Sequence, residues 1–143
     1  QPAQAQRRFT IVAGGHEVTD TRTGLTWRRC AEGQTFDGST CAGTVLLFTH
    51  DAALAHARDQ AGWRLPNVKE LQTLIDRSQT APSIDTSAFP GTPLNWFWTS
   101  TPVVGNESYA WVVVFRSGGG VYLNRRDGVT PDGSSVRLVR ASQ

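Results

Sequence analysis

The sequence of 143 residues contains no methionine and a single lysine, Lys69, so every other basic residue is an arginine. The planar guanidinium group of arginine binds carboxylates, sulfates and phosphates through paired hydrogen bonds. A GC-rich gene would produce the same bias through its codons, so the bias has two interpretations. The formal net charge of +2 is too small to indicate a nucleic-acid partner.

Long hydrophobic runs are also missing, and none approaches the ~20 residues that a membrane-spanning helix needs. With 38% hydrophobic and 18% charged residues, the chain is typical of one globular domain, and its five tryptophans indicate an aromatic-rich interior. Residues 1–8 are polar and contain an A-x-A pattern. We expect them to be a flexible lead-in, or what surrounds a removed signal peptide, before a single domain at residues 9–143.

Catalytic signatures are absent: the sequence has no H-E-x-x-H, P-loop, G-x-S-x-G or dinucleotide-binding glycine pattern. Its histidines are His16, His50 and His56. On a helix the last two would lie about 240° apart, too far to share a metal ion. We therefore expect no enzyme activity, cofactor or metal. A calcium site at Asp127 and Asp132 is the alternative, although two carboxylates fall short of the oxygens that such a site needs.

Only two cysteines occur, Cys30 and Cys41, on either side of a loop rich in glycine, serine and threonine. A disulfide between them would contribute on the order of 2–3 kcal/mol and imply an oxidising compartment. Two free thiols are the alternative. Zinc binding is not expected, because no nearby Cys/His pair completes a ligand set.

The first half of the chain predicts three short strands and two helices. Strands are expected at 9–12, 18–20 and 25–28, the last two as a hairpin. A first helix should run from Thr49 to Ala61 and end at Gly62. After a turn at Pro66, Asn67 and Glu70 have the spacing of a capping box, and they should begin an amphipathic helix of about ten residues.

The second half alternates with period two, which predicts strands at 96–99, 109–115, 121–124 and 136–140. Gly118–Gly120 should form a hairpin turn. The order of the elements favours an α+β fold with two helices packed on twisted antiparallel sheets. The residues that we assign to the core, or that should anchor the 77–94 connection to it, are Trp27, Trp63, Trp98, Trp111, Ile84, Phe89 and Leu94.

Four motifs occur in a familiar order: Val18-Thr19-Asp20 with Thr23-Gly24-Leu25-Thr26-Trp27, Trp63-Arg64-Leu65-Pro66-Asn67-Val68-Lys69-Glu70-Leu71, Phe97-Trp98-Thr99-Ser100-Thr101, and Val136-Arg137-Leu138-Val139-Arg140. Over about residues 9–140 the chain resembles the C-terminal domain family of the Legionella collagen-like adhesin. The resemblance implies a C-type-lectin-like, loop-in-loop fold with paired first and last strands, on an exported bacterial protein. For the named adhesin it also implies binding of sulfated glycosaminoglycans.

The sequence departs from that family pattern at Leu138, where a cysteine often stands, and it has no collagen-like repeat. A local Cys30–Cys41 bridge would replace the usual long-range disulfide. The formylglycine-generating enzymes share this general fold class, but they use a cysteine pair late in the chain. Both cysteines here precede residue 42, which argues against such an oxidase.

In a lectin-like fold, the loops of the C-terminal half form the open face. We expect segments 104–109, 116–118 and 122–127 to converge there. The expected ligand-binding residues are Asn106, Glu107, Tyr109, Arg116, Tyr122, Asn124, Arg125 and Arg126. Aromatic faces stack on sugars, and arginines bind sulfate or carboxylate. An ordinary polar hairpin surface is the alternative.

Together these features predict an exported bacterial binding module, periplasmic, secreted or on the cell surface, that recognises an anionic or sulfated glycan. Its partner would be that glycan or a host protein, and self-association is left open. A protein-binding display domain of the retroelement-diversified type is one alternative. A structural subunit of a pilus or surface fibre is another.

Overall fold

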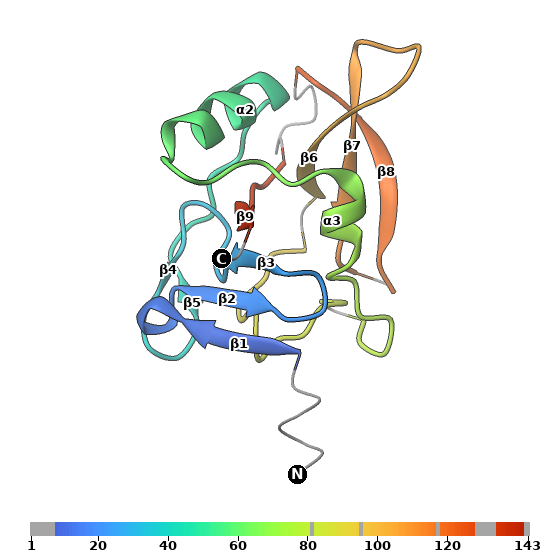
Figure 1. The fold of residues 1–143 in the computed structure, drawn as a ribbon. Helices are drawn as coiled ribbons and strands as arrows, with labels where there is room; N and C mark the ends of the chain where they lie inside the picture. Colours follow the sequence, from blue (N-terminus) through green and yellow to red (C-terminus); the bar gives the residue numbers. More distant parts are fainter. Residues whose placement is uncertain (1–7, 81, 95, 117, 128–133, 142–143) are drawn as a thin grey trace.

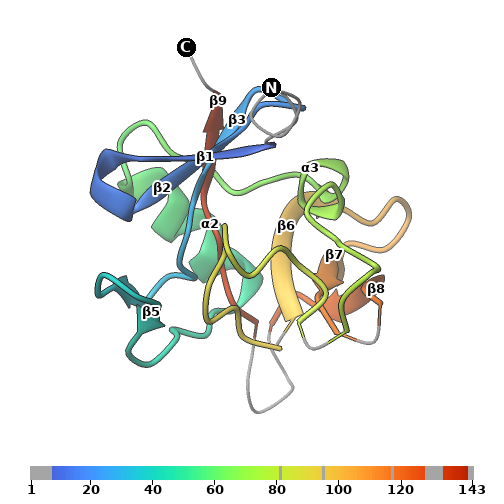
Figure 2. The ribbon, with the colours of Figure 1, turned by 90° about the horizontal axis from the view of Figure 1, so that it is seen from below.

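The computed structural model describes residues 8–80, 82–94, 96–116, 118–127 and 134–141. It is a mixed α+β fold, as expected. A four-stranded and a three-stranded antiparallel sheet form two separate sheets, and two α-helices lie beside them (Figures 1 and 2). None of the helices in these ranges is long and apolar enough to cross a membrane. The elements in chain order are β1 (Phe9–Val12), η1 (Ala13–Gly15), β2 (Glu17–Asp20), β3 (Leu25–Arg28), β4 (Thr35–Phe36), β5 (Cys41–Ala42), α2 (His50–Asp59), α3 (Val68–Gln72), β6 (Trp96–Pro102), β7 (Tyr109–Val114), β8 (Gly120–Arg125) and β9 (Val139–Ala141).

The four-stranded sheet has the order β1-β2-β3-β9, so it brings the first and last strands of the chain into one sheet. The expected pairing of first strand with last strand is wrong in detail, because β1 pairs with β2 and β9 pairs with β3. Across β2, β3 and β9 lie Val18, Trp27 and Val139, paired in register and each fully buried. This row of apolar side chains positions β9 beside β3.

The three-stranded sheet, β6-β7-β8, has its central strand covered on both faces over residues 112–114. Successive side chains of a strand point to opposite faces, so Val112 and Val113 belong to two different hydrophobic clusters. Val113 packs with Phe97 and with Leu71 of α3, whereas Val112 packs with Trp98 and the α2 alanines. The sheet therefore separates two cores.

Both helices begin where the sequence predicts and end earlier. Thr49 caps α2, but the helix stops at Asp59, leaving Ala61 and Gly62 exposed beyond it. The capping box of Asn67 and Glu70 is present in full at the start of α3, which has five residues rather than ten. Beyond it, the amides of Leu74 and Ile75 donate to carbonyls three residues back. The amphipathic pattern thus continues in tighter turns.

Two of the four tryptophans assigned to the core are fully buried, Trp27 and Trp98. Trp63 is half-buried and packs against the edge of the core under α2, so its assignment is confirmed only in part, whereas the half-buried Trp111 belongs to neither hydrophobic cluster and its assignment was wrong. Trp63 contacts the guanidinium groups of two arginines rather than apolar side chains alone. Ile84 and Phe89 anchor the 77–94 connection as expected, but Leu94 does not, because it remains 40% exposed.

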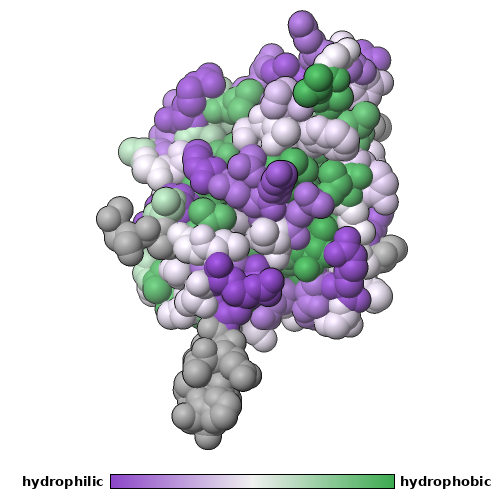
Figure 3. Space-filling model, turned by 45° about the vertical axis from the view of Figure 1, so that its right-hand side comes forward, coloured by the Kyte–Doolittle hydropathy of each residue, from purple (hydrophilic) through white to green (hydrophobic). Residues whose placement is uncertain are grey.

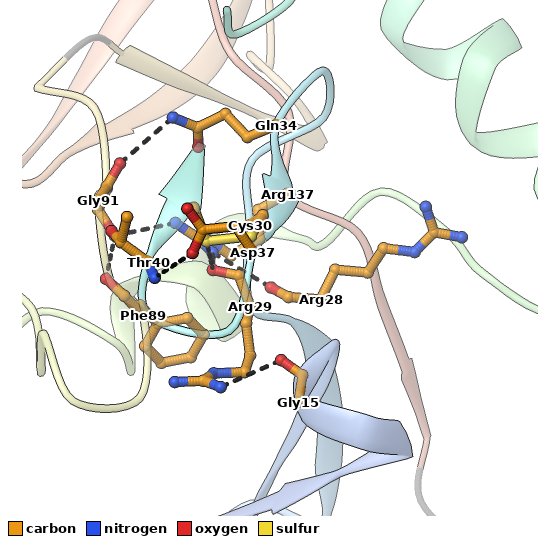
Figure 4. The surroundings of a disulfide bond; sticks show 12 residues. Gly15, Arg28, Arg29, Cys30, Gln34, Asp37, Thr40, Phe89, Gly91 and Arg137 are labelled. Carbon is orange, nitrogen blue, oxygen red and sulfur yellow. Dashed lines mark hydrogen bonds between the residues drawn. A yellow bond between two sulfur atoms is a disulfide. The ribbon is translucent and has the colours of Figure 1, made fainter. Parts of the chain in front are cut away.

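The Cys30–Cys41 disulfide is present, and beside it lies a fully buried arginine (Figure 4). Arg137 donates hydrogen bonds to the carbonyl oxygens of Arg28 and Arg29. It also donates to the Thr92 hydroxyl at 3.1 Å. Its guanidinium carbon lies 4.8 Å from the ring centroid of Phe89, and burial lowers the pKa of Arg137 to about 9. This arginine joins the last segment of the chain to the disulfide-bonded loop.

Candidate binding site

The β7–β8 hairpin places the expected binding segments at two separate ends. Tyr109 pairs with Arg125 at one end, and Val114 pairs with Gly120 at the other. Six residues of strand span about 17–20 Å. Segments 104–109 and 125–127 therefore meet at one end, whereas Arg116 belongs to the turn at the opposite end. The expected convergence of all three segments was wrong.

Where the two segments meet, they border a cavity of about 490 Å³, here called the hairpin-end cleft. It contains three of the expected residues together with the start of α2 and two further residues of the hairpin. The lining residues are Thr49, Asp51, Glu107, Ser108, Arg125, Arg126 and Asp127. The contribution of α2 was missed, because nothing in the sequence indicates that this helix begins beside a loop more than fifty residues away.

Arg126 uses its guanidinium to hold this end of the hairpin against α2. Its Nε donates to His50 Nδ1 at 3.0 Å, and its two Nη atoms donate to Asp51 and to the Glu107 carbonyl. The His50 amide also donates to the Arg126 carbonyl at 2.8 Å. Arg126 therefore positions the cleft and has few donors left for a ligand.

Arg125 differs from its neighbour in both exposure and pairing. Its side chain is 53% exposed, and its hydrogen bond is to Asp127 at 3.1 Å. Within the described ranges, its Nε and Nη1 make no further hydrogen bond. Because Nη2 has a second hydrogen beside the one that bonds to Asp127, Arg125 can still offer a carboxylate or sulfate paired donors, Nη2 together with Nε or with Nη1.

Arg125 belongs to an outer strip on one face of the hairpin, which comprises Tyr109, Trp111, Leu123 and Arg125. Tyr109 faces Arg125 across the strands, and Trp111 faces Leu123 two residues further on, so all four share a face. Both aromatic residues are half-buried, and Leu123 is 41% exposed. Figure 3, turned toward the β8 side, shows hydrophobic groups interspersed with hydrophilic ones. Trp111 was missed as a surface residue, although its spacing from Tyr109 signals a common face.

The remaining expected residues lie elsewhere or serve the fold. Asn124 is buried and donates to Ser134 Oγ at 3.1 Å, so its expected place on the binding surface was wrong. Tyr122 is 51% exposed on the opposite face, where it stacks on Trp96 with ring centroids 6.2 Å apart. Asn106 is exposed and accepts from the Ser108 amide, which shapes its own loop.

Metal ligation has no support in the described ranges, which contain no group of three or more His, Cys, Asp or Glu side chains that could hold an ion. Asp132, one half of the calcium alternative, lies outside those ranges. That alternative stays a prediction.

His50, under the cleft, is held in its neutral form by its two neighbours. Its Nε2 lies 2.9 Å from the Thr99 carbonyl, which can only accept, so Nε2 donates and Nδ1 accepts from Arg126. Burial lowers the pKa of His50, and the positive charge of Arg126 lowers it further, against the opposite influence of the Thr99 carbonyl and Asp51. Protonation at Nδ1 would break the bond to Arg126.

We expect the free energy of unfolding to fall as the pH falls below about 6.5, the usual pKa of histidine in an unfolded chain. In that window the unfolded state binds a proton that the folded state resists, so the slope is positive and at most about 1.4 kcal/mol per pH unit. Urea unfolding at pH 7.5 and 5.2 measures the loss. His50→Gln, which cannot titrate, should lose less stability over the same interval. Equal losses in both proteins would contradict the assignment.

The comparison with protein families gives one result. The family model described as the Lcl C-terminal domain matches residues 16–140, a range that includes both cysteines, the hairpin-end cleft and the outer strip. No curated protein and no solved structure gives a significant match to the chain. Because the match covers most of its length, the chain belongs to the Lcl C-terminal domain family.

Proposed function

We propose that the protein is an exported, adhesin-related module with a C-type-lectin-like fold, and that it binds an anionic glycan at the outer strip beside the hairpin-end cleft. The observation that carries the proposal is the exposed guanidinium of Arg125, with unused donors, next to the half-buried ring of Tyr109. Membership of an adhesin-related family supports a binding role. A disulfide supports folding in an oxidising compartment.

The chemistry of the outer strip suits a sugar that carries a single negatively charged group. Aromatic rings offer apolar faces to a sugar ring, and Arg125 offers paired donors to a sulfate or carboxylate. The adjoining cleft contains three carboxylates, of Asp51, Glu107 and Asp127, which accept from hydroxyl groups but repel a dense polyanion. We therefore propose one anionic group at Arg125, with neutral parts of the glycan reaching toward the cleft. The proposal assigns no catalytic step or cofactor to these residues, and no nucleic-acid partner.

Heparin disaccharides test the proposal, because such a fragment presents sulfates and a carboxylate on a sugar without the long run of charges of the polymer. We expect heparin fragments to bind at 50 mM salt and to lose at least about tenfold in affinity at 300 mM, because exposed charges are screened. Arg125→Ala should lower the affinity at least about tenfold, measured by calorimetry. Arg116→Ala removes the same charge at the other end of the hairpin and serves as the matched control. Equal losses in the two variants, or binding insensitive to salt, would contradict the proposed site.

A protein partner is the second candidate, and exposed apolar side chains favour it. Val104 is 97% exposed at the tip of the loop beside the cleft, and Tyr122 is 51% exposed on β8. Surface aromatic and aliphatic groups of this kind are common in protein interfaces. Salt-insensitive capture of a protein, abolished by Val104→Asp and Tyr122→Ala, would favour this function over glycan binding. The alternative of a fibre subunit stays a prediction.

A further inference from the structure

A second cavity, of about 310 Å³, lies where α2 meets the segment that leads into α3. We call it the interhelix cavity. Its lining residues are Leu54, Ala57, Arg58, Trp63, Arg64, Leu65, Asn67 and Ser100. None of them lines the hairpin-end cleft, so the two are separate features of the surface.

The floor of the interhelix cavity is apolar. Ala57 and Leu65 are each 4% exposed, and both belong to the hydrophobic cluster under α2, to which Leu54 and Trp63 add partly buried side chains. The indole ring of Trp63 is fixed by the guanidinium groups of Arg28 and Arg140, whose central carbons lie 4.7 and 5.1 Å from a ring centroid of this residue. The floor is therefore rigid, which favours a ligand with an apolar body.

The rim of this cavity is positive, and no carboxylate lines it. Arg64 is held by two hydrogen bonds to the Glu70 carboxylate, at 2.7 and 2.8 Å, and its charge is largely balanced by that partner. Arg58 is exposed and has no ion pair or hydrogen bond among the described residues. The uncompensated charge of the cavity is thus the guanidinium of Arg58.

The polar groups of the rim also have hydrogen-bond donors without a protein acceptor. Asn67 Oδ1 accepts a hydrogen bond from the Glu70 amide, which leaves the two Nδ2 hydrogens of Asn67 able to donate to a ligand. Neither those donors nor the Ser100 hydroxyl hydrogen-bonds to another described residue. With Arg58 they form a rim of donors above an apolar floor. A ligand that complements this arrangement has acceptors at one end and hydrocarbon at the other.

We propose that the interhelix cavity binds a small carboxylate with an apolar body, its carboxylate at Arg58 and its hydrocarbon against Leu54 and Leu65. Pockets for small molecules range from about 300 to 1,000 Å³, so this one accommodates a single ring or a short chain rather than a polymer. Binding here does not depend on the glycan site, because Arg125 and the outer strip take no part in it.

Matched pairs of ligands test this assignment, namely benzoate with benzamide and hexanoate with hexanamide. The members of a pair share shape and differ in charge. Titrations followed by protein NMR at low salt should show each acid binding at least about tenfold more tightly than its amide. The largest shifts should fall on Leu54, Leu65 and Trp63. The acids should not displace heparin fragments. Acid binding at the interhelix cavity can therefore be judged whether or not the glycan proposal is correct.

Arg58→Gln should reduce the affinity for each acid to that for its amide. Arg77→Gln, at another exposed arginine that has no partner among the described residues and does not line the cavity, should leave both affinities unchanged. Because both substitutions replace exposed side chains, both variants are expected to fold. The assignment is overturned if neither acid binds at millimolar concentration, if acid and amide bind equally, if Arg58→Gln behaves as the parent, or if the acids displace heparin.

Discussion

Replacing Arg137 with alanine is expected to lower the free energy of unfolding by about 3–5 kcal/mol. The substitution leaves the carbonyl groups of Arg28 and Arg29 and the Thr92 hydroxyl without their donor in a fully buried position. It also opens a cavity between the rings of Phe89 and Phe97, which lie on the guanidinium. Urea unfolding followed by tryptophan fluorescence measures the change.

Arg140→Ala is the matched control, because it removes the same side chain three residues further on. Arg140 is partly exposed and pairs with Glu17 at 2.7 Å, and pairs of this kind contribute about 0–1 kcal/mol. Arg137→Lys keeps the charge but loses the planar fork that reaches three acceptors, so it should also destabilise strongly. A cost for Arg137→Ala no larger than that for Arg140→Ala would show that this buried network adds no net stability.

The features that sequence predicted well are those fixed by neighbours along the chain. The β2–β3 hairpin, the capping box of Asn67 and Glu70 and the Cys30–Cys41 disulfide each depend on residues within about a dozen positions of one another. Arg137 shows the limit of this approach. Period two placed it on the face opposite to Val136 and Leu138, and nothing in the sequence indicates that this face is buried as well. In the fold, residues 134–139 are all buried, so both faces of this segment are covered.

The candidate site illustrates the same division. The sequence identified Arg125, Glu107 and Tyr109, because residue types and turn positions suffice to recognise a polar hairpin end. It could not supply Asp51 or the supporting role of His50, because α2 meets the hairpin only through tertiary packing. The sequence could have predicted that Asn124 does not share a surface with Arg125, since strict alternation puts the two residues on opposite faces of the strand.

Removing the disulfide is the second large effect that we expect. Replacing both Cys30 and Cys41 with serine should lower the free energy of unfolding by about 3 kcal/mol, because the unfolded chain regains the entropy of an open loop of about a dozen residues. Reduction of the parent protein with dithiothreitol should produce a similar loss. The double serine variant treated with dithiothreitol is the control, because it has no disulfide to reduce. A loss under about 1 kcal/mol in both experiments would contradict the expectation.

The two large effects should also be coupled, because the disulfide and Arg137 meet at one short stretch of backbone. Arg137 donates to the carbonyl of Arg29, and the next residue is the disulfide-bonded Cys30 (Figure 4). Opening the loop frees this backbone to move, so its carbonyl no longer holds Arg137 as firmly. Adding Arg137→Ala to the serine variant should therefore cost less than the same change in the parent, by about 0.5 kcal/mol or more. Strict additivity in this double-mutant cycle would mean that the disulfide stabilises the fold through loop entropy alone and plays no part in orienting the acceptors of Arg137.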